Sequence, residues 1–160
     1  MENIIDTNLK GTIMMTRAIL PSMLVAGRGK IINISSVSGC HGIEKQSVYS
    51  ATKHALMGFS ESLNHESYPF VLRGENVGVL DNYIGAPQMY QELIPLGMQI
   101  VNICPGGINT ELWNSENPYT GDKSLLLSPM DIAEMAHYII QSPDRIIFKN
   151  ITMFPNNEIH

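Results

Sequence analysis

The sequence predicts an α/β fold in which crossover helices join the strands of a parallel sheet. Short apolar runs rich in β-branched residues, typical of buried strands, occur at residues 31–34, 98–104 and 146–154. Stretches with helical spacing of apolar residues occur at residues 6–26, 47–66 and 129–141. Helices and strands therefore alternate along the chain, as they do in parallel sheets. The 160 residues suit one domain.

The helix at residues 6–26 has Asp6 or Thr7 as its expected N-cap and Gly27 as its expected end. Pro21 lies inside it, and we expect a bend in the last turns.

The later elements also have expected boundaries and packing sides. The helix at residues 47–66 is expected to pack through Ala55, Leu56, Phe59 and Leu63. Ser128, followed by Pro129 and by an acid at Asp131, is a typical helix start.

Composition excludes several classes of partner. The net charge is −5 and no Lys/Arg-rich run occurs, so neither a nucleic acid nor an anionic membrane surface is expected. No apolar run approaches the roughly 20 residues of a membrane span. The N-terminal residues do not resemble a secretion signal. Because Cys40 and Cys104 lack CxxC spacing, we expect two reduced thiols in a cytoplasmic protein.

The sequence gives little support for a metal site or for a serine hydrolase. The residues that could bind a metal are Cys40, His41, His54, His65 and His137. Apart from the adjacent Cys40 and His41 they lack a familiar ligand spacing, so no metal is expected. A serine hydrolase is disfavoured because G-x-S-x-G does not occur.

Three residues have the spacing expected of a site for alcohol/carbonyl chemistry. Ser36 follows the first strand and lies thirteen positions before Tyr49, and Lys53 lies four positions after Tyr49. Four residues are about one helical turn, so the phenol and the ammonium share a helix face. A nearby cation favours the ionised phenol, which otherwise titrates near ~10. A serine hydroxyl at the end of the strand could hold a substrate oxygen.

The chain resembles the short-chain dehydrogenase/reductases through several motifs in the correct order. YSATK carries the Tyr-x-x-x-Lys pattern, and IINISSVSG carries the strand and the catalytic serine. DTNLKG carries the helix asparagine, and CPGGINT carries the Pro-Gly turn and the threonine. SPMDIAEMAHYII and RIIFKNITMFP match the last helix and strand. The resemblance implies a partial Rossmann-type, doubly wound parallel sheet. Residues 1–160 would form one incomplete catalytic domain that uses NAD or NADP.

The resemblance also implies residue roles. Tyr49 would be the general acid/base, and Lys53 would assist it and bind the nicotinamide ribose. Ser36 would hold the oxygen of a small-molecule alcohol or carbonyl substrate. Asn8 would help to position Lys53 and a water molecule.

The resemblance also assigns further residues to contacts with the cofactor, the substrate and other subunits. Pro105, Gly106 and Ile108 would border the nicotinamide together with Tyr49 and Lys53, and Thr110 would lie near the carboxamide or phosphates. Residues 111–127, with Trp113 and Tyr119, correspond to the substrate loop. Helices 6–26 and 47–66 correspond to a homo-oligomer contact.

The chain departs from the family pattern in two places. It lacks the first half of the family's domain, and neither G-x-x-x-G-x-G nor G-x-G-x-x-G occurs in it. The strand at residues 31–34 would therefore have an open edge. Residues 67–91 interrupt the expected link between helix and strand and are interpreted as an insertion. An alternative is thus an inactive remnant, or an interaction module that pairs through its open sheet edge.

Because the Gly-rich phosphate loop is missing, we expect the isolated chain to bind NADH and NADPH very weakly or not at all. Titration followed by nucleotide fluorescence or calorimetry measures this. Micromolar affinity for either nucleotide would contradict the expectation.

Overall fold

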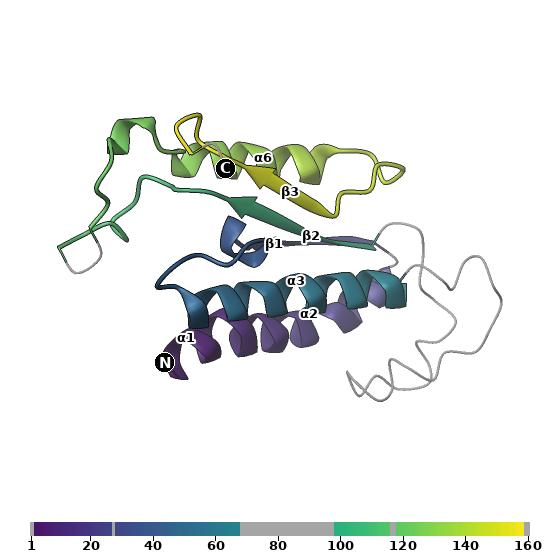
Figure 1. Cartoon of the computed structure of the whole chain (residues 1–160). Coiled ribbons are helices and arrows are strands. Elements are labelled where there is room, and N and C mark those ends of the chain that lie inside the picture. Colours follow the sequence, from purple (N-terminus) through teal and green to yellow (C-terminus); the bar gives the residue numbers. More distant parts are fainter. Residues whose placement is uncertain (1, 27, 68–97, 116–117, 159–160) are drawn as a thin grey trace.

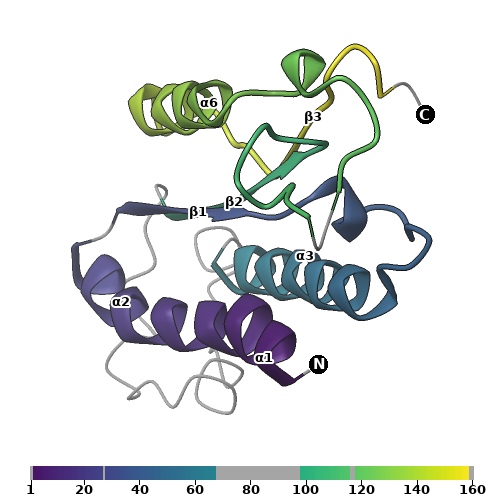
Figure 2. The same cartoon turned by 90° about the vertical axis from the view of Figure 1, so that its left-hand side faces the viewer.

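A computed structural model describes residues 2–26, 28–67, 98–115 and 118–158. It confirms the α/β fold, with a parallel sheet between two layers of helices (Figures 1 and 2). The strands, in sheet order, are β1 (Gly29–Ile34), β2 (Met98–Pro105) and β3 (Asn150–Met153). The helices are α1 (Glu2–Ile5), α2 (Thr12–Ala26), α3 (Ser47–Ser67) and α6 (Pro129–Gln141). Shorter turns are the π-helical η1 (Asp6–Gly11) and the 3₁₀ turns η2 (Val37–Gly39) and η4 (Lys123–Leu125).

The sheet has an apolar cluster on each face. On one face α2 and α3 pack against β1 and β2 through Leu20, Ile31, Leu63, Met98 and Ile100. On the other face α6 packs against β2 through Val101, Ile103, Ile132 and Ile139. All of β2 is buried, because it lies between the other two strands and beneath helices on both sides (Figure 2).

The helix starts show where local sequence patterns succeed and fail. Ser128 caps α6 as expected, and its side chain and that of Asp131 form a reciprocal capping box. The N-cap expected at Asp6 or Thr7 is wrong. Helical backbone already begins at Glu2, and Asp6 starts the π-helical turn η1 between α1 and α2. Chain continuity through Ile5 therefore overrides the capping preference of Asp6.

Two further expectations need correction. The last strand covers Asn150–Met153 instead of beginning at Ile146. Residues 146–148 bond the Gln99 side chain instead of the β2 backbone, because Gln99 donates to the Ile146 carbonyl at 2.8 Å and accepts from the Phe148 amide at 3.4 Å. Backbone pairing with β2 begins at the Lys149 carbonyl, which accepts from the Asn102 amide at 2.8 Å. Ala55 is exposed rather than packed, since α3 meets the sheet through Leu56 and Leu63.

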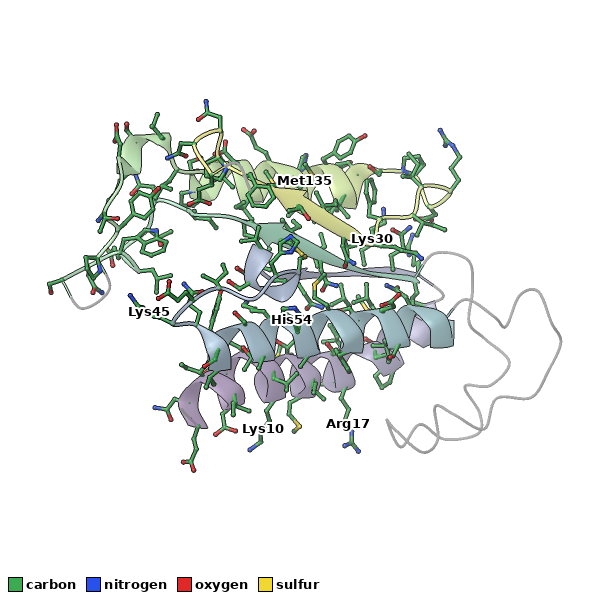
Figure 3. The ribbon with its side chains drawn as sticks, in the orientation of Figure 1. Lys10, Arg17, Lys30, Lys45, His54 and Met135 are labelled. Carbon is green, nitrogen blue, oxygen red and sulfur yellow. The ribbon has the colours of Figure 1, made fainter. Side chains whose placement is uncertain are left out.

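Lys30 fastens the start of β1 to the end of α6 (Figure 3). Its ammonium donates to the carbonyls of Ile139, Ile140 and Ser142 at 2.9, 3.4 and 2.6 Å. These carbonyls lie at the negative end of the helix dipole, so a cation there is favourable. By contrast, Lys10 and Arg17 point away from the sheet (Figure 3).

None of the described helices is long and apolar enough to cross a lipid bilayer. The expected insertion at residues 67–91 lies, apart from Ser67, outside the described residues.

Candidate active site

The predicted site residues gather at the edge of the sheet where β1 and β2 end. The two strands are parallel, with Ile34 opposite Ile103, and the Ser35 amide donates to the Ile103 carbonyl at 2.7 Å. Ser36 and Pro105 therefore leave the sheet at the same edge. Ligands of open parallel sheets bind beyond this edge, which lies at the left in Figure 1 and faces the viewer in Figure 2.

Ser36 is held by the turn that follows β1. It is buried and caps η2, with its side-chain oxygen accepting from the Ser38 amide at 3.1 Å. That bond uses a lone pair of the oxygen and leaves the hydroxyl hydrogen free to donate. Ser36 can therefore still donate to a substrate oxygen. Its neighbour Ser35 is also buried.

Lys53 links helix α3 to the end of β1. Its ammonium donates to the Ile34 carbonyl at 2.9 Å and lies 5.6 Å from the centre of the Tyr49 ring. The structure thus places Tyr49 and Lys53 together as their spacing predicts. It places them next to the strand end that carries Ser36, two residues after Ile34.

The surroundings of Lys53 affect its charge. Burial lowers the pKa of Lys53 below its ordinary value of 10.5, and the negative charge of Cys104, in its ionised form, would counteract part of this effect. Burial also raises the pKa of Cys104 to about 12, so this thiol stays protonated at neutral pH. Of these two groups, only Lys53 can carry a charge at neutral pH.

Asn8 reaches the same helix through Thr52. Its side-chain amide donates to the Thr52 hydroxyl at 3.2 Å, and that hydroxyl donates to the Tyr49 carbonyl at 2.7 Å. Asn8 lies in the π-helical turn η1, a conformation that often marks functional sites. It therefore contacts the residue adjacent to Lys53, and its predicted role toward Lys53 and a water stays a prediction.

The turn after β2 is fixed by backbone contacts. The Gly106 amide donates to the Met153 carbonyl at 2.8 Å, which joins the turn to β3. Gly107 accepts from the Leu127 amide at 3.0 Å, and its own amide donates to the Glu158 carboxylate at 2.8 Å. Pro105 and Gly106 are therefore held at the mouth of the crevice predicted for them.

The loop that follows contains an aromatic pair. The Trp113 indole donates to the Ile108 carbonyl at 2.7 Å, and the Trp113 and Tyr119 rings lie 5.3 Å apart. Thr110 is exposed, and its hydroxyl accepts from the Leu112 amide at 3.4 Å. The loop thus returns along the turn after β2, where residues 111–127 are predicted to meet substrate.

Within the described ranges, no three His, Cys, Asp or Glu side chains are grouped so that they could hold a metal ion.

The site fits one end of a dinucleotide. An ammonium has three donors, and the Ile34 carbonyl is the acceptor found for Lys53 in the described part of the chain, which leaves donors for ribose hydroxyls. The exposed hydroxyl of Thr110 is also accessible to a polar ligand. The sequence contains no Gly-rich motif that would bind the pyrophosphate. Lys53 and Thr110 could therefore hold the nicotinamide end of such a cofactor.

Sequence reasoning missed three contributors to this site. The Ile34 carbonyl carries no side-chain signal, and Thr52 resembles any helix threonine. Glu158 lies near the end of the chain, far in sequence from the turn that it contacts. A strand end facing a lysine on the next helix could have suggested the first contact, whereas the contact of Glu158 depends on tertiary structure.

The parallel sheet with helices on both faces is that of a Rossmann-type α/β protein, a class in which ligands bind beyond the carboxyl ends of the strands. The sequence profile described as "short chain dehydrogenase" matches residues 1–77. An uncharacterized oxidoreductase of Staphylococcus saprophyticus is 32% identical over 154 residues, and one of Staphylococcus aureus is 30% identical over 154 residues. Each alignment covers 96% of this chain but 53% and 54% of the relative. The chain belongs to the short-chain dehydrogenase/reductase family, and it spans about half the length of these relatives.

Solved structures confirm the fold. A serine dehydrogenase complexed with NADP+ has a TM-score of 0.72 at 24% identity and covers 98% of this chain. A 4-hydroxyisoleucine dehydrogenase complexed with NADH has a TM-score of 0.64 at 24% identity. This chain covers 56% of each of those two chains.

Replacing Lys53 with Met tests the electrostatics of the site. The pKa of Lys53 is lower in the folded chain than its ordinary 10.5, so between the two values the unfolded chain binds more protons. Stability that depends on Lys53 must then rise with pH in that window. We expect the unfolding free energy of the wild type, relative to Lys53→Met, to increase as pH approaches 10.5 and to level off above it. Urea denaturation of both proteins across pH measures this. If the difference in unfolding free energy between the two proteins stays constant or falls as pH rises, burial does not lower the pKa of Lys53.

Proposed function

We propose that this chain is the catalytic half of an NAD(P)-dependent oxidoreductase that acts on an alcohol or carbonyl. The observation that carries the proposal is the position of the Lys53 ammonium. It binds the Ile34 carbonyl at 2.9 Å and lies 5.6 Å from the centre of the Tyr49 ring, where the strands end. A phenol and a cation beside a ligand crevice supply a proton-transfer group and an electrostatic partner for it.

Each residue would have a defined part. The Ser36 hydroxyl would donate to the substrate oxygen, and Tyr49 would exchange a proton with the same oxygen. Lys53 would stabilise negative charge that develops on the phenolic oxygen. Asn8, bonded to Thr52 at 3.2 Å, would act as a positioning residue for this face of α3.

The cofactor would occupy the mouth of the crevice. When bound, NAD(P)(H) supplies the hydride chemistry. Pro105, Gly106 and Ile108 would border its nicotinamide and Lys53 would bind its ribose, while Thr110 would bind the carboxamide or phosphate end. The substrate would enter between this turn and residues 111–127.

Replacing Tyr49 with Phe removes the proposed proton-transfer group and keeps the ring. We expect turnover to fall by about 100-fold or more, because general acid/base catalysis contributes at least that much. The measurement is NAD(P)H absorbance with a panel of alcohols and carbonyls. It uses the chain alone and the chain joined to the unmatched part of the Staphylococcus saprophyticus relative. Tyr138→Phe, on the exposed side of α6, is the matched control. Full activity of Tyr49→Phe would remove Tyr49 from this role.

A second candidate function is an interaction module that pairs through the outer edge of β1. Among the described residues β1 pairs with β2 alone, so its other edge is open. A cavity of about 420 Å³ lies beside this edge, lined by Ile31 and Asn33 of β1 and by residues of η1 and α2. Open strand edges promote pairing with other chains. A homo-oligomer contact through helices 6–26 and 47–66 stays a prediction of the family resemblance.

Ile32→Pro tests the second candidate. The Ser35 amide faces β2, and backbone direction alternates along a strand, so the Ile32 amide faces the open edge. Proline removes that donor without removing a bond to β2. If the edge pairs, Ile32→Pro should shift association toward monomer in analytical ultracentrifugation, whereas Ile32→Ala should not. A wild-type chain that stays monomeric at every concentration would exclude self-association through this edge.

A further inference from the structure

The tail after β3 folds back onto the turn after β2. The Glu158 amide donates to the Pro155 carbonyl at 3.0 Å and closes a reverse turn around a buried proline. This turn directs the Glu158 side chain toward β2, where its carboxylate accepts from the Gly107 amide at 2.8 Å. The carboxylate is therefore fixed beside the mouth of the candidate site by contacts on both sides.

The two glycines of the turn make room for this carboxylate. A Cβ atom built on Gly106 would lie 2.5 Å from one oxygen of Glu158, and a Cβ atom on Gly107 would lie 2.5 Å from the other. Neither distance is tolerable for a real side chain, so the carboxylate lies directly against the backbone of the turn. Within the described residues Glu158 forms no ion pair.

An opposite charge lies on the α3 side of the same sheet edge. Lys53 holds its ammonium at the end of β1, 2.9 Å from the Ile34 carbonyl. Acting alone, this ammonium would repel a cationic ligand in the crevice. Glu158, at the end of β2, supplies the charge that would attract one.

A nicotinamide ring carries a positive charge when it is oxidised and none when it is reduced. We propose that Glu158 is a specificity-determining residue that favours the oxidised over the reduced ring at the turn after β2. This inference rests on the proposed function, which has the ring bordered by Pro105, Gly106 and Ile108. Because Coulomb attraction acts over several ångströms, Glu158 need not touch the ring.

The substitution Glu158→Gln separates charge from structure. The glutamine side-chain oxygen can still accept from the Gly107 amide, so the tail can keep its position. Only the negative charge is lost. Glu134→Gln on the exposed surface of α6 changes the net charge of the chain equally and serves as the control.

The experiment titrates the ¹⁵N-labelled full chain with two ring probes and follows the amide signals of Gly106 and Gly107. The probes are the 1-methylnicotinamide cation and neutral 1-methyl-1,4-dihydronicotinamide, which need no phosphate site. For a partly exposed charge pair, the cation should bind roughly two to five times more tightly than the neutral ring. Glu158→Gln should reduce this ratio to about one, and Glu134→Gln should leave it as in the wild type.

Two results would overturn the inference and are distinguishable. If both probes perturb the turn and Glu158→Gln keeps the wild-type ratio, the charge of Glu158 plays no part, although the proposed ring site stands. If neither probe perturbs Gly106 or Gly107, the ring does not bind at this turn, and the proposed cofactor position fails together with the inference.

Discussion

The docking of helix α3 on the sheet is the constraint on which the site depends. Three polar side chains on one helix face fasten it: Lys53 to the Ile34 carbonyl, Ser60 to Asn102 at 2.9 Å, and Asn64 to both backbone groups of Ile100. Their spacing of seven and four residues keeps them on one side of the helix. Because these bonds fix the rotation of α3 about its axis, they also turn the helix face that carries Tyr49 and Lys53 toward the end of β1.

A second polar element sets the register of the strands. Asn33 and Asn102 lie opposite each other on β1 and β2, and Asn102 lies opposite Asn150 on β3. The Asn102 amide donates to the Asn150 side chain at 2.9 Å, and the Ser60 hydroxyl of α3 donates to the Asn102 side chain at 2.9 Å. Asn33 and Asn102 are buried, and buried amides are costly unless they are paired, so a slip of one residue would leave their side chains unsatisfied. These paired amides therefore favour the register in which Ser36 and Pro105 leave the sheet at the same edge.

The parts of this structure that sequence could predict are those set by neighbours in the chain. The capping box at Ser128 and the proximity of Tyr49 to Lys53 need only helical geometry, and both were expected. The late start of β3 was missed because Gln99, from another strand, bonds the segment before it. The position of Glu158 was missed for the same reason. Contacts between distant residues leave no periodic signal, and here they determine where a strand starts and where a charge lies.

The open edge of β1 bears on both proposed functions. Backbone direction alternates along a strand, and the Ser35 amide faces β2, so the Ile34 carbonyl faces away from β2. Lys53 binds that carbonyl. The ammonium that the proposed chemistry needs therefore lies at the boundary where another strand would join the sheet. In a doubly wound sheet the ligand crevice forms where two halves meet. A strand added beside β1 would consequently border Lys53, so completion of the sheet and completion of the cofactor site would be one structural event.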